Sequence, residues 1–287
     1  MSGYRVIILH FIFFLVLSLS CRNQDNKSDN PRNRSQEPLK ETAFNRKTGG
    51  FVYESGAIIR GDTTGNMIAL VFTGDTFADG GEFIAETLKE KNVNGSFFFT
   101  GNFYRIKEFH PVIKRLISDG NYLGSHSDKH LLYCDWEKRD SLLVSKDEFV
   151  KDLKDSYKEM KKFNIDPAAS RFYLPPYEWY NDSIALWTNQ MGLELINFSP
   201  GTRSNADYTY PEMGEKYLDS RCILKSVLDY EKFSPNGLKG FILLVHIGTD
   251  PRRTDKFYSY LPELIDTMKR RGYVFVRVDE LLGNQIK

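Results

Sequence analysis

The sequence predicts an α/β protein in which buried parallel strands alternate with helices. Several short segments, such as Met67–Phe72 and Gly240–His246, are apolar throughout, which is typical of strands covered on both faces. Longer segments between them, such as Gly81–Asn92, show the three-to-four-residue apolar spacing of amphipathic helices. This alternation indicates right-handed crossovers, within either an open sheet or a barrel.

The individual elements follow from composition and periodicity. Pro111–Ser118 places four apolar side chains on one helical face, whereas Gly95–Thr100 reads GSFFFT and Gly240–His246 reads GFILLVH, the clearest strand pattern in the chain. Lys146–Phe163 is long and charged, as expected for a solvent-facing helix. We expect strands at Met67–Phe72, Gly95–Thr100, Asn121–Gly124, Arg171–Leu174, Leu193–Phe198, Gly240–His246 and Tyr273–Val278, and helices at Gly81–Asn92, Pro111–Ser118, Lys146–Phe163, Asp182–Met191 and Lys256–Arg271.

The N-terminal residues predict export. Arg5 precedes an apolar run from Val6 to Leu19, which is too short to span a bilayer but suits a signal peptide. Ser20-Cys21 resembles a bacterial lipobox, with Leu17 one position from its usual place, so lipidation of Cys21 would anchor the protein to a membrane of the cell envelope. The other interpretation is a plain uncleaved anchor. Residues 1–21 are thus the predicted signal, 22–48 a polar disordered linker, and 49–287 one folded domain.

The overall composition is that of an ordinary globular protein, with 41% hydrophobic and 27% charged residues in 287. A formal net charge of +1 gives no electrostatic basis for binding nucleic acid. We therefore expect no nucleic-acid partner.

Polar residues gather where the predicted strands end. Asp75 follows the first strand, His126 the third, Pro176-Tyr177 the fourth and Asp207 the fifth, and His246 ends the sixth. In parallel α/β folds, the carboxyl ends of the strands share one rim, and chemistry collects there. The sequence therefore predicts one site at this rim.

His126 and His130 predict a metal site. Their His-x3-His spacing would place both imidazoles on one face of a helical turn. Asp75 is the best-placed third ligand, and Asp79 and Asp128 are weaker candidates because aspartates in loops often serve turns. This ligand set suits Zn best, with Co, Ni or Mn as other possibilities, and an open position would make a bound water acidic.

Three further groups complete the predicted chemistry. His246 is a candidate general acid that Asp207 would orient; the alternative is a neutral core histidine. The rigid Pro175-Pro176-Tyr177 segment would present the Tyr177 backbone N–H to a developing oxyanion. We expect Pro176, Tyr177 and Trp179 to contact substrate, because aromatic rings stack on sugars, although Trp179 could instead be a core residue.

Taken together, these residues resemble the polysaccharide deacetylase family, the NodB-homology carbohydrate esterases of family 4, over roughly Asn66 to Leu282. His126-Ser-Asp-Lys-His130 is similar to the second motif of that family, Leu244-Val245-His246 to the fifth, and Asp207-Tyr208 approximates the fourth. The resemblance implies a distorted (β/α) barrel. It also implies metal-dependent removal of N- or O-acetyl groups from a polymer of the chitin, peptidoglycan or xylan type, with His246 as the acid.

Two motifs depart from the family pattern. Where the family has Thr-Phe-Asp-Asp, with a general base and then a metal ligand, this chain has Val71-Phe-Thr73-Gly74, and Asp75 comes one place later. Where the third motif has an arginine that pairs with the base, this chain has Leu174. An unpaired buried arginine would be costly, so the two losses are coherent. We expect Asp75 to bind the metal, and Asp79, Glu178 or a metal-activated hydroxide to replace the base.

Three functions remain open from the sequence. The first is a metal-dependent deacetylase of an acetylated polysaccharide or peptidoglycan-like polymer. The second is a catalytically degenerate, glycan-binding member of the same fold. The third is an amidase that acts on non-sugar C–N bonds, against which the aromatic residues near Tyr177 argue mildly.

Overall fold

The computed structural model describes residues 50–283. The predicted signal segment, Cys21 and the predicted linker lie outside this range. Within it, none of the helices combines the length and the apolar character needed to cross a bilayer.

One sheet organises the described residues. Its strand order is β1-β2-β8-β3-β4-β5-β6-β7, and β9 also pairs with β3. From β8 to β7 all neighbouring strands are parallel, whereas β2 runs antiparallel to both β1 and β8. The strands are β1 (Val52–Glu54), β2 (Ala57–Arg60), β3 (Met67–Gly74), β4 (Ser96–Phe99), β5 (Tyr122–Ser125), β6 (Phe172–Tyr173), β7 (Glu194–Leu195), β8 (Phe241–His246) and β9 (Val274–Val276).

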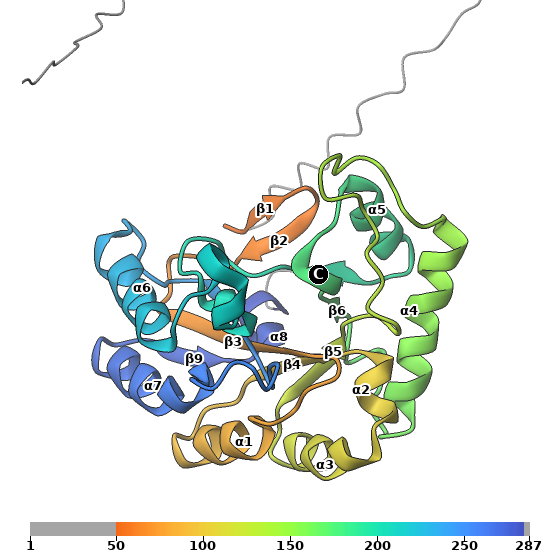
Figure 1. Ribbon diagram of the computed structural model, residues 1–287. Coiled ribbons are helices and arrows are strands. Elements are labelled where there is room, and N and C mark those ends of the chain that lie inside the picture. Colours follow the sequence, from red (N-terminus) through yellow and green to blue (C-terminus); the bar gives the residue numbers. More distant parts are fainter. Residues whose placement is uncertain (1–49, 284–287) are drawn as a thin grey trace, which may run out of the picture. The chain divides into compact units, whose positions relative to one another are not determined.

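The sheet curls until its two ends approach each other. A parallel bridge joins Ile58 of β2 to Ile196, which follows β7, and the Asn197 N–H donates to the Ile58 carbonyl at 2.9 Å. Helices surround the outside of the strands in Figure 1. The predicted α/β class and the distorted barrel are therefore confirmed.

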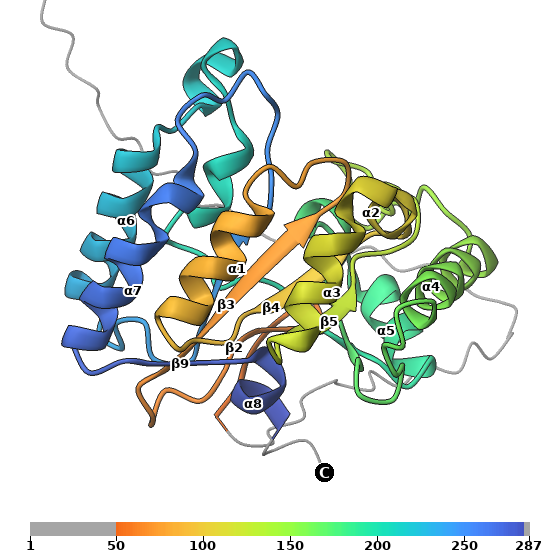
Figure 2. The same ribbon diagram turned by 90° about the horizontal axis from the view of Figure 1, so that it is seen from below.

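Helices cover the outer face of the barrel, and α1, α3 and α7 lie across one side of it in Figure 2. Four predicted helices agree with the observed ones to within two residues at each end, whereas the helix predicted at Lys256–Arg271 begins only at Leu261, after a 3₁₀ turn. The α-helices are α1 (Gly81–Glu90), α2 (Gly101–Arg105), α3 (His110–Ser118), α4 (Lys146–Lys161), α5 (Asp182–Gln190), α6 (Ser220–Phe233), α7 (Leu261–Arg270) and α8 (Val278–Gly283); 3₁₀ turns are η1 (Lys107–Phe109), η2 (Pro176–Glu178), η3 (Ser204–Tyr208), η4 (Pro211–Lys216) and η5 (Phe257–Tyr260).

The β1-β2 hairpin and the helices α2, α6 and α8 were not predicted. The β1-β2 hairpin adds an antiparallel edge, and its first strand is exposed, so it lacks the continuous apolar run of the other strands. Helix α6 begins after its N-cap residue Asp219, whose carboxylate accepts from the Cys222 N–H at 2.8 Å. The buried residues Ile223, Leu224 and Val227 have the spacing of an amphipathic helix, so the sequence did carry a signal for α6.

Alternating side chains of β3 fill the two sides of the sheet. Leu70 and Phe72 pack under the outer helices, whereas Ala69 and Val71 point into the barrel with Leu174. The interior is thus a packed core and not a pore. The register pairs Thr73 of β3 with His246 of β8, so the ends of these neighbouring strands reach the same rim.

Candidate active site

A cavity of about 650 Å³ opens at this rim. It is lined by residues from several separate segments, which include Asp75, His126, His130, Tyr177, Glu178 and His246. The structure thus brings together most of the residues predicted from strand ends, and it adds Trp136 from a loop that the sequence prediction did not assign.

His126 directly follows β5 and is 2% exposed. Its Nδ1 donates to the carbonyl oxygen of Leu174 at 2.8 Å, which fixes the ring and leaves Nε2 as the unprotonated nitrogen. Burial, reinforced by the neighbouring His130, holds the pKa of His126 well below its usual value. The imidazole is therefore neutral at physiological pH, which is the form that binds metals.

His130 reaches the same place from a loop, so the predicted helical turn is wrong. Ser127 and His130 both adopt left-handed backbone conformations, with φ of 75° and 56°, and the His130 N–H donates to Ser127 Oγ at 3.0 Å. The two imidazole centroids lie 5.1 Å apart. Burial also lowers the pKa of His130, against the opposing effect of the Asp75 charge.

Helix α4 holds this loop in place through Asp152, whose role was not predicted. Its carboxylate accepts from the backbone N–H groups of Asp128 and Lys129, at 3.3 and 3.1 Å, and from the Tyr133 hydroxyl at 2.7 Å. Asp128 itself forms an ion pair with Arg105. Asp128, the weaker ligand candidate, therefore serves the loop, and Asp152 positions the backbone that carries His130.

Asp75 follows β3 and faces the cavity. Its Oδ1 accepts from Thr100 Oγ1 at 2.7 Å and from Asn102 Nδ2 at 3.2 Å. The preceding Gly74 is tightly enclosed, because a Cβ there would lie 2.7 Å from Ile247 Cγ2. An aspartate at position 74 does not fit this packing, which explains why the carboxylate comes one residue later.

The donor set at this site fits a divalent cation. Among residues 50–283, no group of three or more His, Cys, Asp or Glu side chains is gathered as closely as a metal requires, and Asp75 is turned toward Thr100 and Asn102. Two neutral imidazoles and one carboxylate nevertheless line the same cavity, and they are ligands that Zn prefers. The buried Thr73 hydroxyl also lines the cavity and has no hydrogen-bond partner there, which points to a bound polar ligand.

His246 is clamped by Asp207 from η3. His246 Nδ1 donates to Asp207 Oδ1 at 2.6 Å, and the His246 backbone N–H donates to Oδ2 at 2.8 Å. Burial alone would lower the pKa of His246, but the Asp207 carboxylate raises it overall. Because Nδ1 is bound to Asp207, Nε2 is the nitrogen that is free to exchange a proton with a substrate. The raised pKa makes the protonated form of the ring more stable. This arrangement suits a general acid.

Tyr177 and Glu178 stand on strained backbone beside the histidines. Both adopt left-handed conformations, with φ of 59° and 53°, which bulky residues adopt only where surrounding structure enforces it. The Tyr177 ring lies 4.4 Å from the His130 ring between centroids. Such outliers gather at functional sites.

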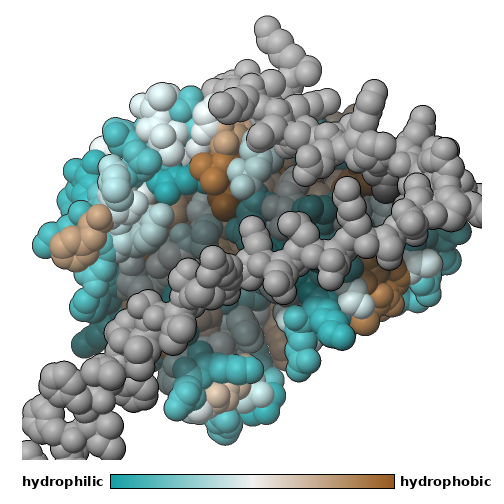
Figure 3. Space-filling model, turned by 90° about the horizontal axis from the view of Figure 1, so that it is seen from above, coloured by the Kyte–Doolittle hydropathy of each residue, from teal (hydrophilic) through white to brown (hydrophobic). Residues whose placement is uncertain are grey.

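The residues predicted to contact substrate are placed differently relative to the cavity, which Tyr177 lines. Trp179 and Pro176 do not line the cavity: Pro176 is buried, and Trp179 donates from its indole N–H to the Asp135 carbonyl at 3.2 Å. Trp136 lies against both Trp179 and Tyr177, with centroids 5.6 and 5.5 Å away. The face in Figure 3 is mainly hydrophilic with small hydrophobic patches. Phe77, Trp136 and Tyr177 are exposed and line the cavity.

Asp79 has a structural role, which removes one of the candidate bases. Its carboxylate accepts from the Thr249 N–H at 2.8 Å and forms an ion pair with Lys256 at 3.0 Å, and it does not line the cavity. Leu174 is fully buried among apolar side chains of the barrel, as expected if no carboxylate remains for an arginine to pair with.

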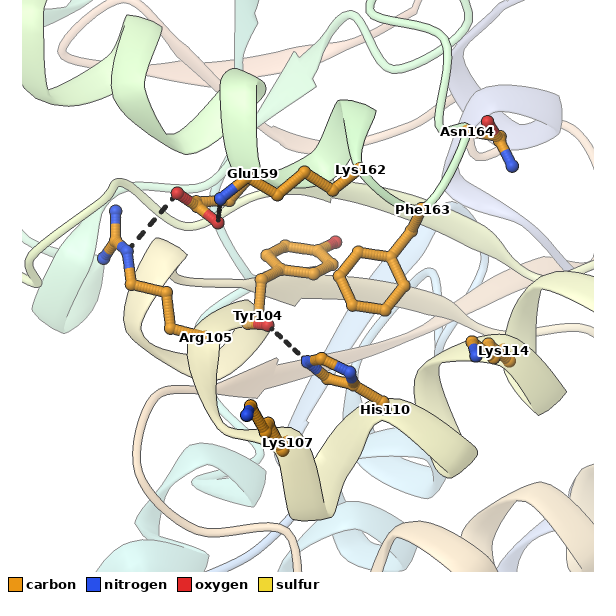
Figure 4. A pocket seen from close by; sticks show the side chains of 9 residues that line it. All are labelled: Tyr104, Arg105, Lys107, His110, Lys114, Glu159, Lys162, Phe163 and Asn164. Atoms are coloured by element: carbon orange, nitrogen blue, oxygen red, sulfur yellow. Dashed lines mark hydrogen bonds and ion pairs between the residues drawn. The ribbon is translucent and has the colours of Figure 1, made fainter.

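A second cavity, of about 570 Å³, lies between α2, α3 and α4 (Figure 4). Two of the cations that line it, Arg105 and Lys162, pair with Glu159, at 3.4 and 2.6 Å. His110 Nε2 is bound to the Tyr104 carbonyl at 3.0 Å. It has one histidine and one carboxylate, so the first cavity is the stronger candidate for catalysis.

Residues 60–196 match the family described as polysaccharide deacetylase. The match covers slightly less than half of the chain, and over these residues the chain resembles polysaccharide deacetylases. A peptidoglycan-N-acetylglucosamine deacetylase of Listeria monocytogenes is 26% identical over 224 residues, which cover 78% of this chain but only 40% of that protein. This chain thus spans less than half the length of that relative.

Solved structures of other proteins share the fold of this chain. The chitin deacetylase of Colletotrichum lindemuthianum has a TM-score of 0.62 at 21% identity, covering 80% of this chain and 93% of that one. A family 4 pseudoenzyme from Bacillus anthracis has a TM-score of 0.61 at 19% identity, covering 80% and 69%. The fold is therefore shared by a chitin deacetylase and by a protein described as a pseudoenzyme, so activity must be argued from this chain's own site.

Proposed function

We propose that this protein is an exported metal-dependent hydrolase that removes acetyl groups from a carbohydrate polymer of the peptidoglycan or chitin type. The carrying observation is that Asp75, His126 and His130 share one cavity with His246, which Asp207 holds by two hydrogen bonds. The cavity thus combines a donor set for a cation with an oriented acid, and a deacetylation needs both.

The residues divide the chemistry as follows. Asp75, His126 and His130 would hold the cation, with Zn the best match to the donors. When bound, a divalent metal there supplies a Lewis acid that makes water nucleophilic and polarises the acetyl carbonyl. The Tyr177 backbone N–H stabilises the oxyanion. His246 gives its Nε2 proton to the departing amine or alcohol, and Asp207 keeps the ring in that orientation.

The proposed substrate class follows from the cavity mouth. Trp136 and Tyr177 present exposed rings at its edge, and aromatic rings stack on the apolar faces of sugars. The named relatives that act on peptidoglycan and chitin support a glycan over a non-sugar amide. The test is acetate release from a panel of N- and O-acetylated glycans by the zinc-loaded full chain; abolition by a chelator and recovery with Zn support the proposal, and no release from any member rejects it.

A second candidate function is glycan binding without turnover. It is favoured by Thr73 and Gly74, which replace the two carboxylates of the first motif, and by the apolar burial of Leu174. Glycan binding that survives in Asp75→Ala and His246→Ala, with no acetate released by the wild type, would establish it.

Lipid attachment at Cys21 is part of the proposal and rests on sequence alone. It predicts that the full chain partitions into the membrane fraction of the bacterium and that Cys21→Ala releases it. A wild-type chain found wholly in the soluble fraction would contradict anchoring.

A further inference from the structure

The site has a predicted metal-binding position, where water would be activated, and an acid, His246, but it lacks the family's usual general base. Thr73 stands where the family has its base aspartate, and a hydroxyl cannot take up a proton at neutral pH. Asp75 accepts two hydrogen bonds through Oδ1 and is assigned to the cation. A further carboxylate that faces the cavity could take over the role of the missing base.

Among residues 50–283, two other carboxylates line the cavity, those of Asp250 and Glu178. Asp250 is bound by the Arg252 guanidinium through both carboxylate oxygens, at 2.9 and 2.6 Å. Arg252 lowers the pKa of Asp250 to about 2, so Asp250 is a very weak base. Glu178 has no such cation and is the remaining candidate.

The backbone at Glu178 is built to aim its side chain. Its left-handed conformation is locked by the Glu178 N–H, which donates to the Pro175 carbonyl at 3.1 Å, and by Asn197 Nδ2, which donates to the Glu178 carbonyl at 2.9 Å. The surrounding structure therefore enforces the strained backbone of a residue that lines the cavity, as is common at functional sites.

The surroundings of Glu178 match the requirements of a base. The titratable groups that face it are His246 from β8 and Asp207 and Tyr208 from η3. Burial raises the pKa of Glu178 to about 7, with His246 opposing and Asp207 adding to the effect. A carboxylate that titrates near the working pH is an efficient proton acceptor.

We propose that Glu178 is the general base of this site and acts opposite His246. The inference rests on the proposed deacetylase function. Glu178 takes one proton from the attacking water as its oxygen bonds to the acetyl carbon. The bond from that carbon to the sugar nitrogen or oxygen then breaks, and the leaving group receives one proton from His246. Acetic acid departs and loses its proton to solvent as acetate, and Glu178 returns its proton to His246 through solvent, which restores the site.

Glu178→Gln tests this role, because the amide keeps the shape but cannot accept the proton. We expect zinc content and KM to stay near wild type, kcat to fall by roughly 10²–10³, and the rise of activity with pH through about 7 to disappear. Asp79→Asn is the matched control and keeps wild-type kinetics. Equal loss in both variants, or an active wild type matched by Glu178→Gln, overturns Glu178 as the base.

A wild type that releases no acetate rejects the proposed function and the base together, whereas an active wild type with an unaffected Glu178→Gln rejects the base alone. A second readout needs no turnover. Burial raises the pKa of Glu178 in the folded protein to about 7, so ionisation of Glu178 destabilises the folded state at higher pH. Glu178→Gln removes this penalty. We therefore expect Glu178→Gln to raise Tm by about 3 °C or more at pH 8.5 but not at pH 4. An unchanged Tm difference across this range overturns the burial on which the base depends.

Discussion

The two halves of the candidate site differ in how they relate to the family motifs. One half, comprising His126, His130 and His246, matches the family motifs and is held by hydrogen bonds to Leu174 and Asp207. The other half, built around Thr73 and Gly74, lacks both carboxylates of the first motif. The matching half predicts chemistry directly, whereas the altered half has to be understood from packing.

Packing shows that the altered half is internally consistent. Gly74 has no room for a side chain beside Ile247, and Asp75 supplies a carboxylate from the next position. Leu174, which stands where the family has an arginine, packs within an apolar cluster. A site that had merely lost its function would not require a strained Glu178 at the same cavity. The altered half thus has the properties of a rearranged site.

Removing a ligand from the matching half should have the largest effect. His126→Ala deletes a predicted metal ligand. Losing a group that merely hydrogen-bonds a metal ligand costs up to roughly 100-fold in metal affinity or activity. We therefore expect a larger loss here, in both zinc content and acetate release. Metal analysis of the purified chain and an acetate assay measure this. His110→Ala is the control, because His110 lies in the second cavity; comparable zinc loss in both variants would contradict the assignment.

The acid arm should come next. His246→Ala should lower kcat by about 10²–10⁴ with zinc retained. Asp207 raises the pKa of His246, so the acid form persists to higher pH in the wild type and activity falls as pH rises through that value. Asp207→Asn should therefore move this alkaline fall to lower pH. A pH profile of kcat is the measurement, and an unmoved alkaline limb would remove Asp207 from the mechanism.

These expectations also show what sequence could and could not provide. Strand ends were predictable, because β3 and β8 are apolar throughout and carry Asp75 and His246 at one rim. The His130 loop was not, because its shape depends on Ser127 and on Asp152, which lies on α4. Trp136 escaped notice for the same reason, since a loop ring reaches a cavity only through tertiary contacts such as that with Trp179.

A substitution at the enclosed Gly74 tests the packing of the altered half, with a smaller expected effect. Gly74→Ala places a Cβ 2.7 Å from Ile247 Cγ2 and 3.0 Å from Phe103 Cε2, so the free energy of unfolding should fall by about 1–3 kcal/mol. Denaturant unfolding measures the change. Gly65→Ala is the matched control, since its nearest neighbour, Met67 Cε, is 3.5 Å away. Equal stability of the two variants would mean that packing does not dictate the shift to Asp75.

The smallest effect should come from the cavity mouth, where the two halves meet. Trp136 is 55% exposed and contacts Tyr177, so Trp136→Ala removes a sugar-stacking surface worth about 1 kcal/mol. We expect KM for a polymeric substrate to rise roughly fivefold with kcat unchanged, and KM for a small acetyl ester to stay constant. Phe233→Ala, which removes a still more exposed aromatic side chain on α6, should change neither. A loss confined to kcat would instead place Trp136 in support of Tyr177 and its backbone N–H, which would join the loop to the reacting centre.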